Sequence, residues 1–179
     1  MSKKASLRRA LIAARQAVSA DVRAEWDADI AGRVHAWWLA NPVRILGVYW
    51  PIQDEPDLRS MYAELSRKGV ALALPVVTDK DAPLEFAAWS PGDALIKDAH
   101  GVPVPAETRI FMRPEALLVP CVGFNAQRFR LGYGAGYYDR TLAALPRPLT
   151  VGIAYTCALA AFDAAPHDIA LDTIITETA

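Results

Sequence analysis

The chain contains little cysteine. Cys121 and Cys157 are the two cysteines among 179 residues, and they form no C-x-x-C pair. This spacing gives no indication of a zinc site or of a disulfide framework. Both cysteines lie in apolar contexts, and free cysteine is among the residue types most often buried. We therefore expect two buried, reduced thiols.

The sequence also lacks a long apolar run and an excess of charge of either sign. No run approaches the roughly 20 apolar residues that a membrane-spanning helix needs. The basic start, Ser2-Lys3-Lys4, continues into residues 5–9, whose arginines interrupt any signal-peptide core. The formal net charge is -1, which argues against general binding to nucleic acid or to anionic membranes. We expect a cytoplasmic, monomeric protein without a nucleic-acid or membrane partner.

Three common catalytic patterns are missing as well. The chain has no G-x-x-x-x-G-K-[ST] motif, which argues against P-loop kinase chemistry. Glycines alternate over residues 132–136, but Tyr137 stands where the dinucleotide fingerprint G-x-G-x-x-G needs a glycine. His35, His100 and His167 lie in unrelated contexts, so no Ser-His-Asp or Cys-His group can be assigned. For His167, which is near the expected ligands, we predict a structural or capping role.

What the chain does have is an alternation of helix and strand patterns. Apolar residues at helical spacing predict helices at 4–18 and 19–41, with Ser19 as the N-cap of the second. Almost uniformly apolar runs predict strands that are covered on both faces. These runs are residues 44–50, 70–77, 116–122 and 149–155, and a final strand is predicted at 171–177. We predict a single α/β domain over residues 1–179, a three-layer α/β/α fold that is Rossmann-like, with a mostly parallel central sheet.

The first two predicted strands and the helix between them define a candidate ligand-binding edge. Asp54 is expected to cap this helix, Pro56 fits its first turn, and Gly69 supplies its stop. A right-handed βαβ unit places the turn after the first strand at the carboxyl end of the sheet, where ligands bind. Candidate contacts in this turn are Trp50, Gln53, Asp54 and Glu55. The proline-rich segment 91–114 predicts an irregular excursion, and we find no chemistry in it.

The stretch from Arg130 to Arg140 is where we expect the ligand. It has the sequence Arg-Leu-Gly-Tyr-Gly-Ala-Gly-Tyr-Tyr-Asp-Arg and enters a predicted helix at 137–145. Glycines allow positive φ, so that successive backbone N–H groups can form an anion-binding nest beside the arginines. The tyrosines can stack on a flat heterocycle, and Asp139 can hold a hard cation such as Mg²⁺. We infer a nucleotide-phosphate site with a metal ion.

The first predicted helix has a basic side that includes Lys4 and Arg8. These residues are four apart, so they project from the same face of the helix and can together contact a polyphosphate. The alternative is a solvated basic face, which is the more common role of charged helix surfaces. The spacing alone favours this alternative.

Taken together, these residues resemble the signature of the 5-formyltetrahydrofolate cyclo-ligase family, also called methenyltetrahydrofolate synthetases. The central match is Val119-Pro120, Gly123-Phe124 and the stretch from Arg130 to Arg140. Further matches agree in order and spacing and extend over nearly the whole chain. They are Lys4 to Arg8, Gln53-Asp54-Glu55, Leu74-Pro75, Gly152-Ile153-Ala154-Tyr155, and the close from His167-Asp168 to Leu171-Asp172.

The resemblance implies an enzyme that uses ATP and Mg²⁺ to convert 5-formyltetrahydrofolate, a reduced folate, to 5,10-methenyltetrahydrofolate with release of ADP and phosphate. In this chemistry the γ-phosphoryl group moves to the formyl oxygen, and the neighbouring N10 attacks the activated carbon before phosphate leaves. Such a reaction depends on in-line positioning and charge stabilisation more than on a strong general base.

The resemblance also implies roles for individual residues. Catalytic roles fall to Arg130, Tyr138 and Asp139, and the metal ligands are Asp139 and Asp172. The pterin and formyl group face Trp50, Glu55, Tyr133, Gly134, Ala135, Gly136 and Tyr137, and Glu55 hydrogen-bonds the pterin. ATP is bound by Lys4, Arg8, Arg130, Leu131, Gly132, Tyr133, Gly134, Ala135, Gly136, Tyr137 and Tyr138. Under this resemblance Lys4 and Arg8 contact phosphate, in contrast to what spacing alone favours.

The chain departs from the family's pattern at positions that carry no phosphate or metal assignment. They are Leu58 for Thr, Val104 for Glu, Asn125 for Asp, Arg128 for Gly, and Ala158 in a region where the family tends to have Gln. Two alternatives stay open: a non-catalytic folate or nucleotide binder of the same fold, and an isomerase or transferase that acts on a phosphorylated sugar. The presence of Asp139 and Lys4 argues against the first. The lack of an assignable general base at a strand end argues against the second.

Overall fold

The computed structural model describes residues 3–107 and 110–178, and its centre is a seven-stranded sheet in the order β11-β10-β7-β1-β2-β3-β6. The strands from β11 to β2 are parallel, whereas β3 and β6 pair in antiparallel fashion at one edge. The strands are β1 (Ile45–Gly47), β2 (Ala71–Val76), β3 (Glu85–Trp89), β6 (Phe111–Met112), β7 (Ala116–Pro120), β10 (Leu149–Ile153) and β11 (Thr173–Ile175). The predicted α/β fold with a mostly parallel sheet is confirmed.

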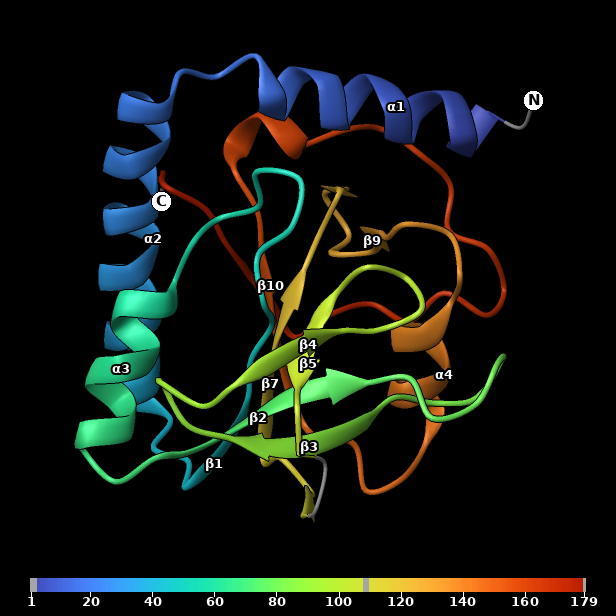
Figure 1. Ribbon diagram of the computed structural model, residues 1–179. Coiled ribbons are helices and arrows are strands. Elements are labelled where there is room, and N and C mark those ends of the chain that lie inside the picture. Colours follow the sequence, from blue (N-terminus) through green and yellow to red (C-terminus); the bar gives the residue numbers. More distant parts are fainter. Residues whose placement is uncertain (1–2, 108–109, 179) are drawn as a thin grey trace.

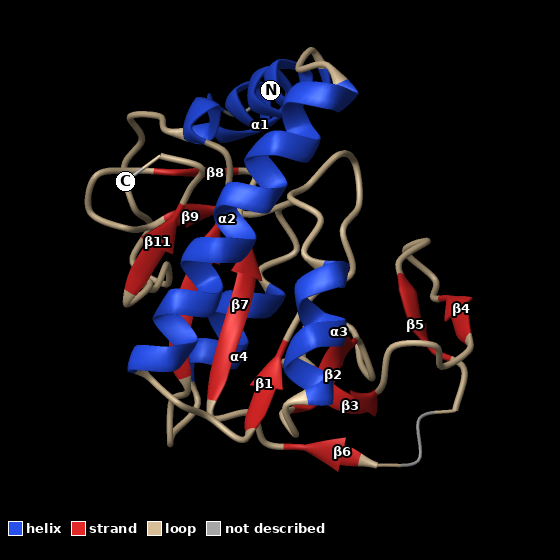
Figure 2. Ribbon diagram, turned by 90° about the vertical axis from the view of Figure 1, so that its left-hand side faces the viewer, coloured by secondary structure: helices blue, strands red, loops and turns tan. Residues whose placement is uncertain are grey.

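Helices cover both faces of this sheet. Helices α2 (Ala20–Ala40) and α3 (Arg59–Arg67) lie on one face, and α4 (Tyr137–Ala143) lies on the other (Figures 1 and 2). Because side chains alternate along a strand, neighbours on β7 pack in different layers. Leu118 belongs to the core cluster of α2 and α3, whereas Leu117 and Val119 pack in the cluster that contains Leu142 of α4. Each fully buried leucine of this kind stabilises the fold by roughly 1.5–3 kcal/mol.

Helix α1 (Lys3–Gln16) lies across the end of the sheet towards which β7 points (Figure 1). Its residue Leu11 clusters with Val122 and with Leu131 of β9 (Arg130–Leu131), which pairs with β8 (Gly123–Phe124). A Cβ atom at Gly123 would force the Leu11 side chain to shift, so glycine allows this close approach. The helix is therefore packed directly on the strands that lead into residues 132–136, which we call the glycine-rich loop.

Helix α3 begins later than the sequence predicts. Its first residue is Arg59 and its N-cap is Leu58, which makes no capping hydrogen bond through its side chain. Gln53 and Asp54 have φ of 48° and 58°, a left-handed conformation that belongs to a turn rather than to a helix start. The side chain of Asp54 pairs instead with Arg23 of α2, with 3.0 Å between Nη2 and Oδ1. A loop from residue 48 to residue 58 therefore lies at the carboxyl end of β1.

The described residues of segment 91–114 form more regular structure than the sequence predicts. Strands β4 (Leu95–Lys97) and β5 (Pro103–Pro105) form an antiparallel hairpin, and β6 joins the central sheet.

Two local predictions are confirmed: Ser19 caps α2 by accepting a hydrogen bond from Val22 N, and Gly69 follows α3 with a φ of 89°. Within the described ranges, no helix combines the length and the apolar character that a membrane crossing requires.

The prediction of two buried thiols is confirmed for Cys121 and wrong for Cys157. Cys121 is buried between the sheet and α4, and burial raises the pKa of its thiol to about 12. Cys157 is exposed, because it lies in the short 3₁₀ helix Thr156–Ala158 that follows β10. Its neighbour Ala158 faces the core instead. An apolar sequence context does not reveal which side of a single helical turn faces solvent.

Candidate active site

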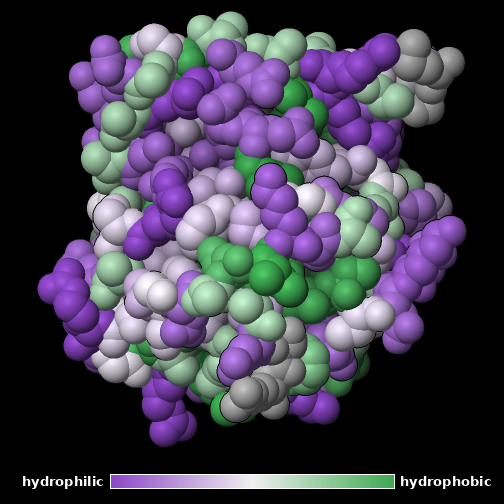
Figure 3. All heavy atoms as spheres, viewed as in Figure 1, coloured by the Kyte–Doolittle hydropathy of each residue, from purple (hydrophilic) through white to green (hydrophobic). Residues whose placement is uncertain are grey.

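A cavity of about 630 Å³ opens at the carboxyl ends of β1, β2 and β7. Trp50, Pro75 and Pro120 contribute one wall, and α1 and the glycine-rich loop contribute another. Figure 3 shows hydrophobic residues gathered in the middle of this face, below a band of hydrophilic residues. The volume is in the range of small-molecule sites, and the mixture of apolar wall and clustered charge is typical of them.

The structure brings nearly all of the predicted site residues to this one cavity. Its lining includes Lys4, Arg8, Trp50, Glu55, Arg130, Leu131, Gly132, Tyr133, Gly134, Ala135, Gly136, Tyr137, Tyr138 and Asp139. These residues come from α1, from the loop after β1, and from the continuous segment formed by β9, the glycine-rich loop and the first turn of α4. Segments more than one hundred residues apart in sequence therefore meet at the edge that the βαβ pattern predicted.

The glycine-rich loop has a backbone that glycine alone adopts without strain. Gly134 has a φ of 107°, and Gly136, the N-cap of α4, has a φ of 70°. Two arginines hold carbonyl oxygens of this loop: Arg8 Nε donates to Gly132 O at 2.7 Å, and Arg140 Nη2 donates to Ala135 O at 2.8 Å. The loop is thus held on both sides by guanidinium groups, which add positive charge beside its backbone N–H groups.

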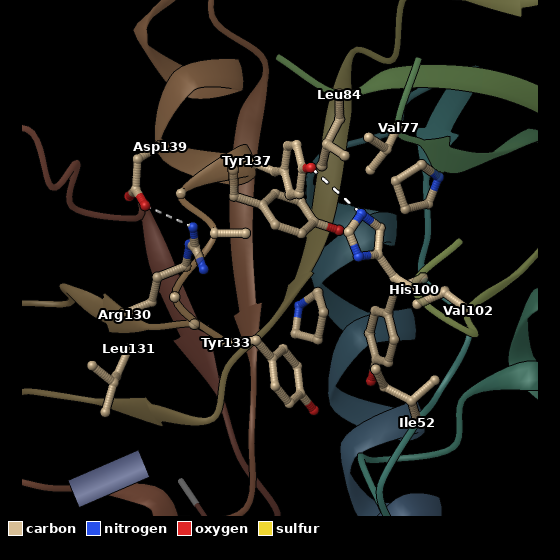
Figure 4. A pocket seen from close by; sticks show the side chains of 18 of the residues that line it. Ile52, Val77, Leu84, His100, Val102, Arg130, Leu131, Tyr133, Tyr137 and Asp139 are labelled. Carbon is tan, nitrogen blue, oxygen red and sulfur yellow. Dashed lines mark hydrogen bonds and ion pairs between the residues drawn. The ribbon is translucent and has the colours of Figure 1, made fainter. Parts of the chain in front are cut away.

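Arg130 and Asp139 form a pair at the base of the loop (Figure 4). Arg130 Nη2 lies 3.0 Å from Asp139 Oδ2, and the guanidinium lies 5.0 Å from the ring centroid of Tyr138. The side chain of Arg130 is 5% exposed. Its Nε atom is buried and, among the described residues, has no hydrogen-bond partner. A buried donor without an acceptor is costly, and a bound anion can satisfy it.

Glu55 is a carboxylate buried in the wall of the cavity. It is 4% exposed, Oε1 accepts from Tyr133 OH at 2.7 Å, and Oε2 accepts from Ile52 N at 3.0 Å. Burial raises the pKa of Glu55 above its usual range, and the hydrogen bonds from Tyr133 and Ile52 oppose this only in part. The side chain is therefore held in one orientation at a place where few groups compensate its charge.

Helix α1 does not present a purely solvated basic face. Lys4 Nζ lies 2.8 Å from Asp168 Oδ2, and Arg8 holds the glycine-rich loop. Arg15, a further basic residue of the same helix, is buried. It donates to Gln53 O at 2.9 Å and to Tyr133 OH at 3.1 Å. Charge alone could not show that this end of the helix turns inward.

Sequence reasoning missed the contribution of the β4–β5 hairpin. Asp98, His100 and Val102, at the turn of the hairpin, line the cavity opposite the glycine-rich loop. The ring nitrogen Nε2 of His100 lies 3.5 Å from the hydroxyl of Tyr137, and Figure 4 shows the two side chains facing each other. Each strand of this hairpin is three residues long and β5 contains two prolines, so no periodicity marked them.

Two predicted site residues, Asp54 and Asp172, do not line the cavity. The carboxylate of Asp54 pairs with Arg23 instead, and Asp172 lies near Thr150. The carboxylate of Asp172 accepts hydrogen bonds from Thr150 N at 2.8 Å, Thr150 Oγ1 at 2.7 Å and Arg147 Nη2 at 2.8 Å. The part of the chain that the structure describes contains no cluster of three His, Cys, Asp or Glu residues able to hold a metal ion. His167 also lines the cavity; its side chain is 79% exposed, and Nε2 lies 3.6 Å from Oδ1 of Asp168.

Known proteins are similar to this chain in sequence and in fold. The model of the 5-formyltetrahydrofolate cyclo-ligase family matches residues 1–177. The 5-formyltetrahydrofolate cyclo-ligases of Mycoplasma pneumoniae and Mycolicibacterium smegmatis are each 30% identical to this chain, over 97% of it and over 98% and 93% of their own lengths.

Two solved structures agree with these relatives. A 5,10-methenyltetrahydrofolate synthetase from Mycoplasma pneumoniae superposes with a TM-score of 0.82 at 27% identity, over 98% of this chain and 99% of its own. The synthetase from Aquifex aeolicus gives a TM-score of 0.83 at 29% identity, over 99% and 91%. From its sequence and its fold, the chain belongs to the 5-formyltetrahydrofolate cyclo-ligase family.

Proposed function

We propose that the protein catalyses the ATP- and Mg²⁺-dependent conversion of 5-formyltetrahydrofolate to 5,10-methenyltetrahydrofolate, with release of ADP and phosphate. The observation that carries this proposal is the cavity itself. The cationic side chains of α1 and of Arg130 line one part of it, and the buried carboxylate of Glu55 lies in another. A protein of this family that has both parts in one cavity can bring a phosphoryl donor and a reduced folate together.

The residues of the phosphate side fit a polyphosphate. Arg130 has a buried Nε donor without a protein acceptor, and Lys4 and Arg8 line the same cavity. Gly134 and Gly136 give the loop the left-handed backbone from which consecutive N–H groups can face an anion. When bound, ATP would supply the phosphoryl group that activates the formyl oxygen, and Mg²⁺ would neutralise the charge of its phosphates.

The residues fit a magnesium ion that is shared with the phosphates. Mg²⁺ is often held by one or two carboxylates together with substrate phosphates and water, so a cage of protein ligands is not needed. Asp139 lines the cavity and its side chain is 16% exposed, which leaves it accessible beside Arg130. Asp139 is therefore our candidate metal ligand, and Asp172, which lies outside the cavity, receives no support for this role.

The residues of the folate side fit a pterin. Glu55 is an oriented, buried acceptor, and acceptors of this kind recognise the N–H groups of a flat heterocycle. The ring of Trp50 lines the cavity and is fixed from behind by Arg59, whose guanidinium lies 4.9 Å from the ring centroid. Tyr133 and Tyr137 add aromatic surface from the glycine-rich loop. We assign the pterin and formyl group to these side chains.

An absorbance assay tests the proposal directly. Purified protein is mixed with 5-formyltetrahydrofolate, and formation of 5,10-methenyltetrahydrofolate is followed with and without ATP and Mg²⁺. We expect product only when both are present, together with one ADP per product. Binding of the folate or of ATP without turnover would instead support a non-catalytic binder of the same fold. A cytoplasmic location and a monomeric state stay predictions.

A further inference from the structure

A buried arginine lies behind the wall of the cavity. Arg15, in the last turn of α1, is 4% exposed and does not line the cavity. Its Nε donates to Gln53 O at 2.9 Å, and its Nη2 donates to Tyr133 OH at 3.1 Å. Burial of a charged side chain is costly unless its donors are satisfied and its charge is compensated. A solvated helix face therefore does not account for Arg15.

The hydrogen bonds of Arg15 continue to Glu55. The hydroxyl of Tyr133, which accepts from Arg15, donates to Glu55 Oε1 at 2.7 Å. Gln53, whose carbonyl accepts from the same guanidinium, lies two residues before Glu55 in the loop after β1. Arg15 thus holds both the loop that carries Glu55 and the side chain that hydrogen-bonds it.

We propose that Arg15 is a positioning residue for the folate side of the site, which orients the Glu55 carboxylate through Tyr133 and Gln53 without touching the substrate. The inference rests on the proposed function, in which Glu55 binds the pterin. The inference gives Arg15 a different role from Lys4 and Arg8, although the spacing of the three residues places them on one face of α1. Those two residues line the cavity, and they contact Asp168 and Gly132.

The chemistry of a guanidinium suits this role. Its planar fork presents Nε and Nη2 in fixed directions, so one side chain can reach acceptors on two separate segments. Its positive charge beside the phenol oxygen makes the Tyr133 hydroxyl a stronger donor to Glu55. The same charge favours the ionised form of Glu55, which burial disfavours. A lysine keeps the charge but, as a compact point charge on a flexible stem, does not reproduce the two fixed contacts.

The test compares the Michaelis constants of the full-length wild type with those of Arg15→Lys, Tyr133→Phe and the double variant. Arg9→Ala, which changes an exposed arginine of the same helix, is the matched control. Arg15→Lys is expected to raise KM for 5-formyltetrahydrofolate about tenfold, because charge-assisted contacts are lost, while KM for ATP changes less than about twofold. In the Tyr133→Phe background, Arg15→Lys is expected to raise KM for 5-formyltetrahydrofolate by a further factor of about three or less. The reason is that the Tyr133 hydroxyl, which links Arg15 to Glu55, is already absent.

Any result other than the expected one contradicts the inference. Equal rises in both Michaelis constants, or an undiminished effect of Arg15→Lys in the Tyr133→Phe background, would overturn it. If Arg15→Lys unfolds the protein, Arg15→Gln takes its place, and this variant must then raise KM for the folate selectively. A wild type without ATP-dependent turnover rejects the proposed function, and this inference with it. If the wild type is active but the variants raise both Michaelis constants equally, only the proposed role of Arg15 is rejected.

Discussion

Arg130 and Asp139 are paired with each other across the cavity floor, with 3.0 Å between Nη2 and Oδ2. The side chains are 5% and 16% exposed, so the pair is largely withdrawn from water. One partner is the proposed phosphate ligand and the other is the proposed metal ligand. Each therefore holds the other in place before a nucleotide binds, which lowers the cost of ordering the site.

Replacement of Asp139 is expected to separate catalysis from stability. Asp139→Asn should abolish turnover but keep most of the stability, because the amide oxygen still accepts from Arg130 while the charge that attracts Mg²⁺ is gone. Asp139→Ala should also abolish turnover, and it should lower the free energy of unfolding by about 3 kcal/mol because it leaves Arg130 buried without its partner. Steady-state assays and urea unfolding measure the two effects. Full turnover of Asp139→Asn would remove Asp139 from the metal role.

Lys4→Ala is expected to act on the nucleotide alone. We predict a rise of about tenfold in KM for ATP, because a charge-assisted contact with phosphate is lost, and no change in KM for the folate. Lys3→Ala, at the exposed neighbouring position, is the control. If KM for ATP is unchanged, Lys4 serves only its ion pair with Asp168, which spans 2.8 Å.

Glu55 is expected to make the protein less stable as the pH rises. Burial raises the pKa of Glu55 above its usual value of 4.5. The unfolded chain releases this proton near pH 4.5, whereas the folded protein still holds it, so stability falls as the pH rises from there through the folded pKa. Urea unfolding of the wild type and of Glu55→Gln over a pH series measures this contribution as the difference between the two curves. A difference that is flat or increases with pH contradicts the prediction.

Asp172 is expected to support structure rather than metal binding. Asp172→Ala removes the acceptor for Thr150 and Arg147, so we predict a loss of about 1–2 kcal/mol in the free energy of unfolding. The Mg²⁺ concentration needed for half-maximal turnover should stay that of the wild type. A marked rise in this concentration would instead show that Asp172 reaches the metal.

Local patterns were sufficient for the framework of this protein. The spacing of apolar residues predicts the helices and the buried parallel strands, and Ser19 and Gly69 mark a helix start and a helix end correctly. These features depend on neighbours within a few residues, so they can be recognised in one dimension. The glycine-rich stretch is equally local, because the left-handed conformations of Gly134 and Gly136 require that residue type.

What the tertiary structure decided are the relations between distant segments. The sequence determines that Arg15 is basic and lies on a helix, but only the packing of α1 on Val122 and Leu131 turns its end inward to Tyr133. In the same way, only the folded chain shows that His100 faces Tyr137 and that Asp172 bonds with Thr150 rather than lining the cavity. The positions of charged and polar residues in the sequence do not show which of their side chains are buried. Their surroundings come from elements far away in the sequence, and these surroundings decide which of them form the site.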